Sequence, residues 1–253
     1  MGGTILNVAT VLVGSLAGLA VGNRLPPRLR MAVVAGLGIV TLYIGFDNAR
    51  ATGNIIIPLL AIVIGVLIGE ALHLDRRLER VGEWLQSRFG RGKIEDIDGE
   101  DDSKVQDARS RFVTGFVTAS LVFCIGPLTF LGAIYDGMGL PLGFRMLAIK
   151  STLDGFASMA FAASFGIGVI FSAVSVFVIQ GGLALVGVLV GEIMSEAMLD
   201  ETTAVGGLIL IGLSFLLMDI KDLRIANFLP ALVIAPLLVA LAEALGLNIY
   251  PQI

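Results

Sequence analysis

Two charged side chains lie well inside an apolar segment of this sequence. The segment FRMLAIKSTLDGFASMAFAASFG, residues 144–166, carries Lys150 and Asp154 in a run otherwise typical of a membrane-spanning helix. Together with Ser158 they are spaced i, i+4 and i+8, which places all three on one face of a helix. Ionisable residues at such depth are costly, so they pair with one another, turn inward or line a water-filled path.

The Lys150–Asp154 pair has two open interpretations. In the first, the two charges neutralise each other and Lys150 extends toward the outer surface. In the second, Asp154 binds a proton or cation, and Lys150 tunes its affinity. We favour the second, because Ser151 and Thr152 lie beside the pair and Asp136 lies at the outer end of the preceding segment.

A Gly-Pro dipeptide interrupts that preceding segment, FVTGFVTASLVFCIGPLTFLGAIYDGMG (112–139). Proline inside a helix removes a backbone hydrogen bond and clashes with the previous turn. Gly126-Pro127 therefore predicts a hinge, either a simple kink or a break. A break would present amide groups to an anion and free carbonyl groups to a cation. Asn7 and Gln180 are further candidates, which either line a cavity or hydrogen-bond between helices.

Catalytic and metal-binding chemistry find little support in the sequence. Cys124 and His73 are each the only residue of their type, so we expect no disulfide framework, metal site or cofactor. No HExxH, GxSxG or P-loop motif is present. Asp136 and Asp154 could share a proton in an intramembrane aspartyl hydrolase, but the GxGD context is missing and Lys150 favours two ionised carboxylates.

The composition identifies the elements that must position these residues. The chain has 253 residues, 56% hydrophobic and 15% charged, with a mean hydropathy of +0.93. Repeated apolar stretches of about 20 residues indicate transmembrane helices, since strands would alternate in polarity. We therefore predict an all-α polytopic bundle in the lipid bilayer. The net charge of −4 gives no indication of a nucleic-acid partner.

Eight transmembrane spans fit the hydrophobic pattern. We expect Gly166 and Gly168 to form a tight turn between the fifth and sixth spans. Most Lys and Arg residues then fall on one side, which is cytoplasmic by the positive-inside rule, and both termini lie outside. The acidic connection 195–203 also lies outside. The spans are 4–22, 31–48, 55–74, 112–134, 146–165, 169–194, 204–219 and 227–246.

A cytoplasmic segment and an internal repeat complete the predicted organisation. Residues 75–111 combine an interfacial amphipathic helix, with Trp84 at the headgroups, and an acidic mobile loop at 93–107. Spans 1–3 resemble spans 6–8 in their small-residue patterns, which suggests an inverted repeat of the kind common in secondary transporters. The predicted units are repeat A (1–74), the cytoplasmic segment (75–111), central spans 4–5 (112–168) and repeat B (169–253).

Glycines recur at intervals of four residues in several spans. Such series let helix backbones approach closely, either within a tight bundle or across a homodimer interface. The series are Gly14, Gly18 and Gly22; Gly65 and Gly69; and Gly187 and Gly191.

Four stretches carry a family resemblance that extends over nearly the whole chain. They are RLPPRLR, FCIGPLTFLGAIYDGMG, IKSTLDGFASMAFAASFGIGVIFSA and FLPALVIAPLL. On these the sequence resembles the bacterial membrane proteins of unknown function typified by YdfK and YqgA. The resemblance implies a bacterial inner-membrane protein and supplies no substrate.

We therefore infer the function from the residues themselves and not from the resemblance. We expect a transporter or channel for a small ion or solute, with or without coupling to protons, and with its polar site on spans 4 and 5. The alternatives are a non-transporting membrane scaffold or sensor and, with less support, the aspartyl hydrolase.

Overall fold

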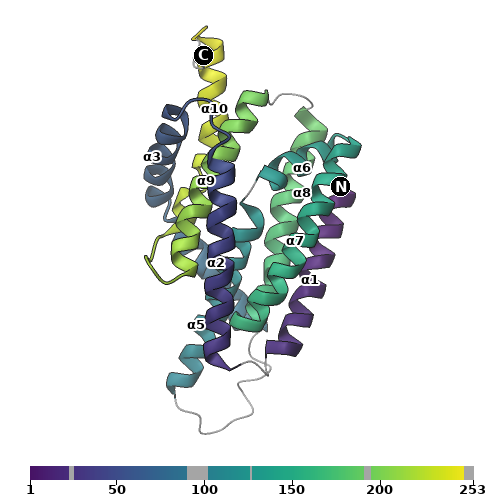
Figure 1. The fold of residues 1–253 in the computed structure, drawn as a ribbon, viewed down its shortest axis with the longest axis vertical. Coiled ribbons are helices and arrows are strands. Elements are labelled where there is room, and N and C mark those ends of the chain that lie inside the picture. The colour runs from purple at the N-terminus through teal and green to yellow at the C-terminus, as the bar shows by residue number, and fades with distance from the viewer. Residues whose placement is uncertain (23–25, 90–101, 126, 191–194, 248–253) are drawn as a thin grey trace.

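Helices make up the regular structure throughout the described part of the chain. The computed structural model describes residues 1–22, 26–89, 102–125, 127–190 and 195–247, and every regular element in these ranges is helical (Figure 1). The predicted all-α polytopic bundle is confirmed. The elements are α1 (Gly2–Gly22), α2 (Pro27–Ala49), α3 (Ile56–Ala71), α4 (Leu74–Phe89), α5 (Asp102–Cys124), α6 (Pro127–Gly137), α7 (Pro141–Phe165), η2 (Ile167–Phe171), α8 (Ser172–Val190), α9 (Glu196–Leu217), η3 (Ile225–Phe228) and α10 (Ala231–Ala244).

Each predicted span overlaps one helix or one pair of consecutive helices. In the described residues, five helical segments are long and apolar enough to cross a bilayer, and two bent pairs raise this to as many as seven. Helix α7 is 25 residues long, yet it is not among them. Lys150 and Asp154 lower its hydropathy, so the span count of eight stays a prediction.

Two helices begin earlier than the hydrophobic pattern predicts. Helix α5 begins at Asp102 instead of near residue 112, so the predicted loop 93–107 ends in a helix; most of that loop lies outside the described residues. Helix α9 begins at Glu196 instead of near 204, because the Ser195 hydroxyl accepts a hydrogen bond from the Met198 amide and caps the helix. Charged residues in the first turns concealed both starts.

The predicted amphipathic helix is present as α4, which follows α3 after a bend of 54°. Its apolar face is partly buried and partly exposed. Leu85 is buried against Phe112 and Phe116 of α5. Val81 and Trp84 stay exposed, which leaves them available to a membrane surface.

Helix α1 runs parallel to α7 along most of its length. Gly3 lies against Leu147, and further down the pair a methyl group on Gly18 would collide with the Met159 carbonyl oxygen. This close approach needs glycine on α1. The glycine series therefore serves packing within the chain at every described position, since Gly65, Gly69 and Gly187 likewise contact neighbouring helices; Gly191 lies outside the described residues.

The outer helices pack in antiparallel pairs. Gly45 of α2 approaches Gly207 of α9, while Gly38 lies against Leu217 and Met218. Helices α3 and α10 also pack in antiparallel orientation, and α8 packs against α1. Helix α6 lies between α7 and α8 near the upper end of Figure 1, where α1 begins and α10 ends.

The turn predicted between α7 and η2 is confirmed. Gly166 ends α7 with φ of +89°, a conformation that side chains other than glycine rarely adopt. Gly168 serves a different purpose, since a methyl group there would collide with the Phe112 carbonyl oxygen of α5.

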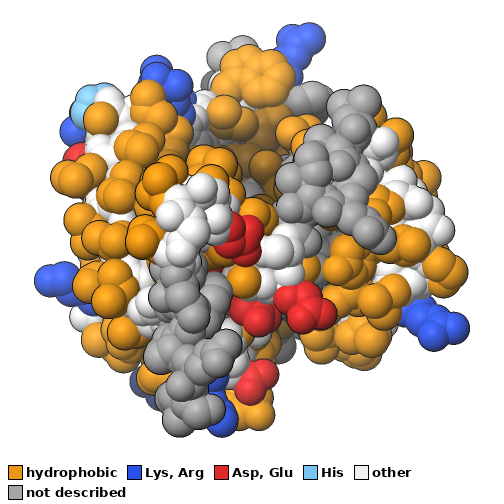
Figure 2. Space-filling view, turned by 90° about the horizontal axis from the view of Figure 1, so that it is seen from above, with side chains coloured by type: hydrophobic (Ala, Val, Ile, Leu, Met, Phe, Trp, Pro, Cys, Tyr) orange, Lys and Arg blue, Asp and Glu red, His pale blue; other side chains and the backbone are white. Residues whose placement is uncertain are grey.

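The bundle has an aliphatic and aromatic core and an apolar outer surface. Phe123 of α5 and Phe161 of α7 meet in the core at a ring-centroid distance of 6.1 Å. Many large apolar side chains point outward, including Val13, Leu67 and Phe156. Viewed onto the end where α1 begins, apolar side chains occupy much of the rim and acidic side chains gather near the middle (Figure 2). An exposed apolar rim of this kind suits contact with lipid tails.

Candidate functional site

The helix predicted to contain a hinge is broken. Helix α5 ends at Cys124, α6 begins at Pro127, and the axes of the two helices differ by 77°. The structure therefore has the break instead of the simple kink; Gly126 lies outside the described residues. The buried Thr129 hydroxyl donates to the Phe123 carbonyl oxygen at 3.2 Å, so it satisfies one of the carbonyl groups near the break.

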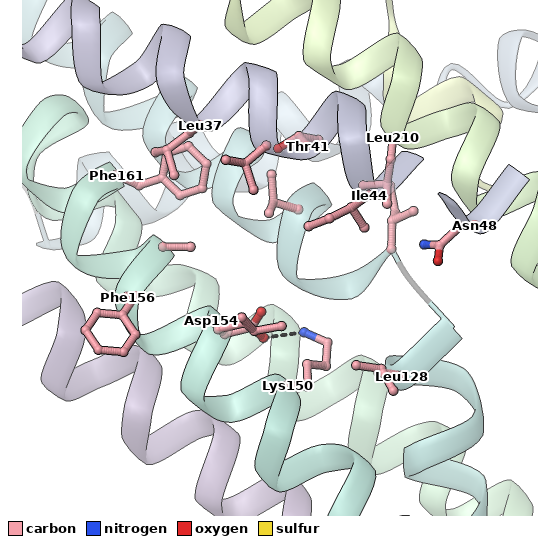
Figure 3. A pocket seen from close by; sticks show the side chains of 15 residues that line it. Leu37, Thr41, Ile44, Asn48, Leu128, Lys150, Asp154, Phe156, Phe161 and Leu210 are labelled. Atoms are coloured by element: carbon pink, nitrogen blue, oxygen red, sulfur yellow. Dashed lines mark hydrogen bonds and ion pairs between the residues drawn. The ribbon is translucent and has the colours of Figure 1, made fainter. Parts of the chain in front are cut away.

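A cavity of about 510 Å³ lies beside this break (Figure 3). Helices α2 and α7 supply most of its lining, with contributions from both sides of the break and from α9. The lining is mainly aliphatic and aromatic, and its polar side chains are few. The lining residues are Leu37, Val40, Thr41, Ile44, Asn48, Val122, Ile125, Leu128, Lys150, Leu153, Asp154, Phe156, Ala157, Phe161 and Leu210.

The cavity opens sideways, between α2 and α7. Four of its lining residues are also strongly exposed on the apolar outer surface: Val40 is 55% exposed, Ile44 38%, Leu153 54% and Phe156 68%. In a bilayer these side chains would face lipid tails. The cavity therefore connects the hydrocarbon region with the interior of the bundle.

Lys150 and Asp154 reach this cavity from α7, as Figure 3 shows. Their side chains form an ion pair and are only 7% and 9% exposed, respectively. Asn7 lies on α1, which packs against α7 and does not line the cavity, and it donates its Nδ2 hydrogen to Asp154 Oδ2 at 2.9 Å. Both hydrogen bonds use Oδ2, and no described residue donates to Oδ1. The carboxylate thus keeps one oxygen able to accept a proton or a ligand donor.

Asp136, which we expected to support the Lys150–Asp154 pair, lies at the start of α1 and does not line the cavity. Its carboxylate accepts the Gly3 amide hydrogen at 3.0 Å, and the Met1 amine lies 3.0 Å from the same oxygen. The tilt of α6 carries Asp136 past α7 to the start of α1. Asp136 and Asp154 have separate partners, so they do not share a proton as the hydrolase hypothesis requires.

Three predicted polar residues of α7 do not reach the cavity. Ser151 donates to the Leu147 carbonyl oxygen at 2.6 Å and is satisfied within its own helix. Thr152 is exposed and likewise donates to a carbonyl oxygen of α7. Ser158 is buried next to Gly14 of α1. Ser158 is turned by about 80° from Lys150 around the helix axis, toward the side of α7 that contacts α1.

Gln180 is fully buried on α8 and is not among the residues that line the cavity. Neither of its amide atoms has a hydrogen-bond partner among the described residues. The prediction that it lines a cavity or bonds to another helix therefore has no support from the described contacts.

Two polar residues of the cavity were not predicted. Thr41 and Asn48 lie on α2, in a stripe with Leu37 and Ile44 at helical spacing. A search for polar residues within this i, i+4, i+7, i+11 stripe would have found them.

Glu201 is a second omission, away from the cavity. It is fully buried and accepts hydrogen bonds from the Thr52 hydroxyl and from the Gly53 and Asn54 amides. This carboxylate therefore holds the connection between α2 and α3. Ala204 and Val205 follow it by three and four residues, so the longer α9 helix would have indicated its burial.

Metal ligands do not gather in the described part of the chain, where no group of three or more His, Cys, Asp or Glu is placed to hold an ion. The chemistry available at the cavity is that of an ion pair beside an apolar chamber. Such a site can exchange protons and bind a polar group, and the apolar lining can hold the remainder of a small molecule.

Comparison with known proteins shows relatives of the same length. The chain is 30% identical to the uncharacterized protein YqgA of Escherichia coli over 92% of this chain and 94% of that protein. It is 25% identical to the uncharacterized membrane protein YdfK of Bacillus subtilis over 98% and 100%. No solved structure matches. The family model for "Protein of unknown function (DUF554)" matches residues 2–240, so this membrane protein belongs to that family.

Proposed function

We propose that this protein is a transporter or channel for a small ion or solute, and that the Lys150–Asp154 pair is its binding site. The cavity that reaches the pair carries this proposal. A pair that served packing alone would be enclosed by side chains on every side. Here about 510 Å³ of space adjoins it, at a broken helix in the bundle interior. Broken helices commonly form such sites in transporters.

The charges of the site favour coupling to protons. The pair is neutral overall, and an uncompensated charge in an apolar chamber is costly. An anion would therefore bind most readily together with a proton on Asp154. A cation would bind most readily if Lys150 lost a proton. In either case solute binding and proton binding are linked at the same two side chains.

The helix pairing is consistent with the proposed inverted repeat. Helices α1, α2 and α3 correspond to α8, α9 and α10 in sequence pattern, and they are also packing partners in that order. The antiparallel contacts of α2 with α9 and of α3 with α10 suit two halves of opposite topology. We further propose the bacterial inner membrane as the location, with both termini outside.

Proteoliposomes test the proposal. Vesicles with a trapped pH-sensitive dye would be exposed to a panel of small organic anions, organic cations and inorganic ions. We expect at least one solute to move protons across the membrane with wild-type protein and not with Asp154→Asn. Thr152→Val is a matched control, since Thr152 lies on the same helix but is exposed. Equal proton movement with Asp154→Asn, or none with any solute, would reject the transport role and favour a scaffold or sensor.

A further inference from the structure

Five buried polar atoms lack hydrogen-bond partners among the described residues. They belong to four side chains in the upper and middle parts of the bundle: Thr4 Oγ1, Asn7 Oδ1, Ser15 Oγ, and Gln180 Oε1 and Nε2. Buried polar atoms are almost always hydrogen-bonded, to protein or to internal water. These unpartnered atoms therefore call for a ligand that can both donate and accept hydrogen bonds.

Three of these side chains share one face of α1. Thr4 and Ser15 are separated by nearly whole turns of the helix, and Asn7 lies within about 80° of both. All three are almost completely buried, with exposures of 2%, 0% and 0% in the order Thr4, Asn7, Ser15. The face is thus a polar stripe inside the bundle, where α1 packs against α7 and α8.

Gln180 lies on the buried face of α8. The same face carries Ala184, whose backbone touches Gly137 of α6, and Gly187, which touches Ile134. Gln180 precedes Ala184 by four residues, so it lies about 6 Å, or roughly one helical turn, below the contact with α6.

Asp136 lies at the upper end of this polar region. It immediately precedes Gly137 and accepts the Gly3 amide hydrogen. Asn7 follows Gly3 by four residues, so Asn7 and Gln180 both lie about one turn below the level of Asp136. Asn7 then bonds to Asp154 through Nδ2, with its Oδ1 left unpartnered.

We infer that these side chains enclose buried water molecules, and that this water carries protons between Asp136 and Asp154. The inference rests on the proposed role of Asp154 as a proton-binding carboxylate. A proton from the outer solution binds first near Asp136, passes through water beside Thr4, Asn7 and Gln180, and forms an O–H bond on Asp154. One proton thus leaves the outer solution for each Asp154 carboxylate that is neutralised.

This route differs from the path that a solute would take. The cavity reaches Asp154 from the side of α2, and among its described lining residues only Lys150 and Asp154 are ionisable. Its mouth is apolar and faces lipid, which is a poor path for protons. The route beside α1 contains side chains that hydrogen-bond water. Protons and solute thus meet at Asp154 from opposite sides.

Infrared spectroscopy of the full-length protein in lipid vesicles tests the route. After a downward pH jump outside, the carboxyl band that disappears in Asp154→Asn reports proton arrival at this residue. We expect Gln180→Leu and Thr4→Val to slow its appearance about tenfold, which equals about 1.4 kcal/mol in barrier height. Both replacements nearly conserve volume, so folding should survive in at least one. Thr152→Val, on an exposed face of α7, is the matched control and should leave the rate unchanged.

The outcomes separate this inference from the proposed function. Unchanged rates in both Gln180→Leu and Thr4→Val would overturn the route, as would slowing by Thr152→Val alone or the absence of any Asp154 band. If the band behaves as expected while no solute moves protons, the route stands and the transport role fails. A high-resolution map of the protein in a nanodisc should show ordered water at Asn7 and Gln180, and a dry map would also overturn the route.

Discussion

The Lys150–Asp154 pair predicts a strong energetic coupling between its two members. The side chains are 7% and 9% exposed, so water screens their interaction little. Removing one member of a buried ion pair typically costs about 3–5 kcal/mol of folding free energy, because the other charge is left uncompensated. Replacing both with apolar residues is often neutral or even stabilising. Lys150→Met and Asp154→Leu should therefore each destabilise the protein, and their combination should be close to wild type.

The structure also ranks the two single changes. In Lys150→Met, Asp154 keeps the Asn7 hydrogen bond and can take up a proton, which places the loss near the lower end, about 3 kcal/mol. In Asp154→Leu, Lys150 loses the one hydrogen-bond acceptor it has among the described residues, so we expect about 5 kcal/mol.

A double-mutant cycle measures this coupling. The free energy of unfolding would be determined for wild type, both single variants and the double variant in bicelles. The expected double variant is more stable than either single variant, so the sum of the single losses exceeds the double loss by several kcal/mol. Additive losses would refute the reasoning, since they would mean that the two charges do not depend on each other. The stable double variant should also have lost any proton-coupled transport, whereas a scaffold would keep its function.

Two further changes test contacts that hold helices and connections together in the bundle. Gly18→Ala should destabilise the protein by about 1–3 kcal/mol in the same unfolding assay, because the added methyl group collides with the Met159 carbonyl oxygen. The control Gly36→Ala has open space around it and should be neutral or stabilising. Equal effects of the two changes would contradict the close approach of α1 and α7. Glu201→Ala should cost about 2–5 kcal/mol and raise amide hydrogen exchange in residues 50–55, because three donors lose their acceptor. The exposed Glu196→Ala serves as its control, and unchanged exchange in Glu201→Ala would show that the carboxylate does not hold this connection.

Much of the fold and part of the site could be predicted from local sequence patterns. Long apolar stretches predict helices because the hydrocarbon core offers no partner for free backbone groups. Gly126-Pro127 predicts a kink or a break for a local reason too, since proline cannot continue the backbone hydrogen bonding. Lys150 and Asp154 are four residues apart on one helix, so their pairing depends on helix geometry alone.

The starts of α5 and α9 show where local patterns were insufficient. Hydropathy marks the apolar part of a helix, while the helix itself begins wherever a cap or a neighbouring helix stabilises its first turns. Glu201 was missed for this reason. In an acidic stretch it looked like a loop residue, and only the contact of α9 with the connection between α2 and α3 makes it a buried acceptor.

The sequence by itself determined the membrane bundle, the interruption at Gly126-Pro127 and the closeness of Lys150 to Asp154, because each depends on residues close together in the chain. Only the tertiary structure decided that Asn7 bonds to Asp154, that Asp136 binds the start of α1, and that Ser158 faces Gly14. Helical periodicity gives every helix several faces, and it does not say which neighbour covers each face. That choice follows from the close approach of backbones at glycines such as Gly18, which brings α1 against α7 and leaves the cavity on the other side of Asp154.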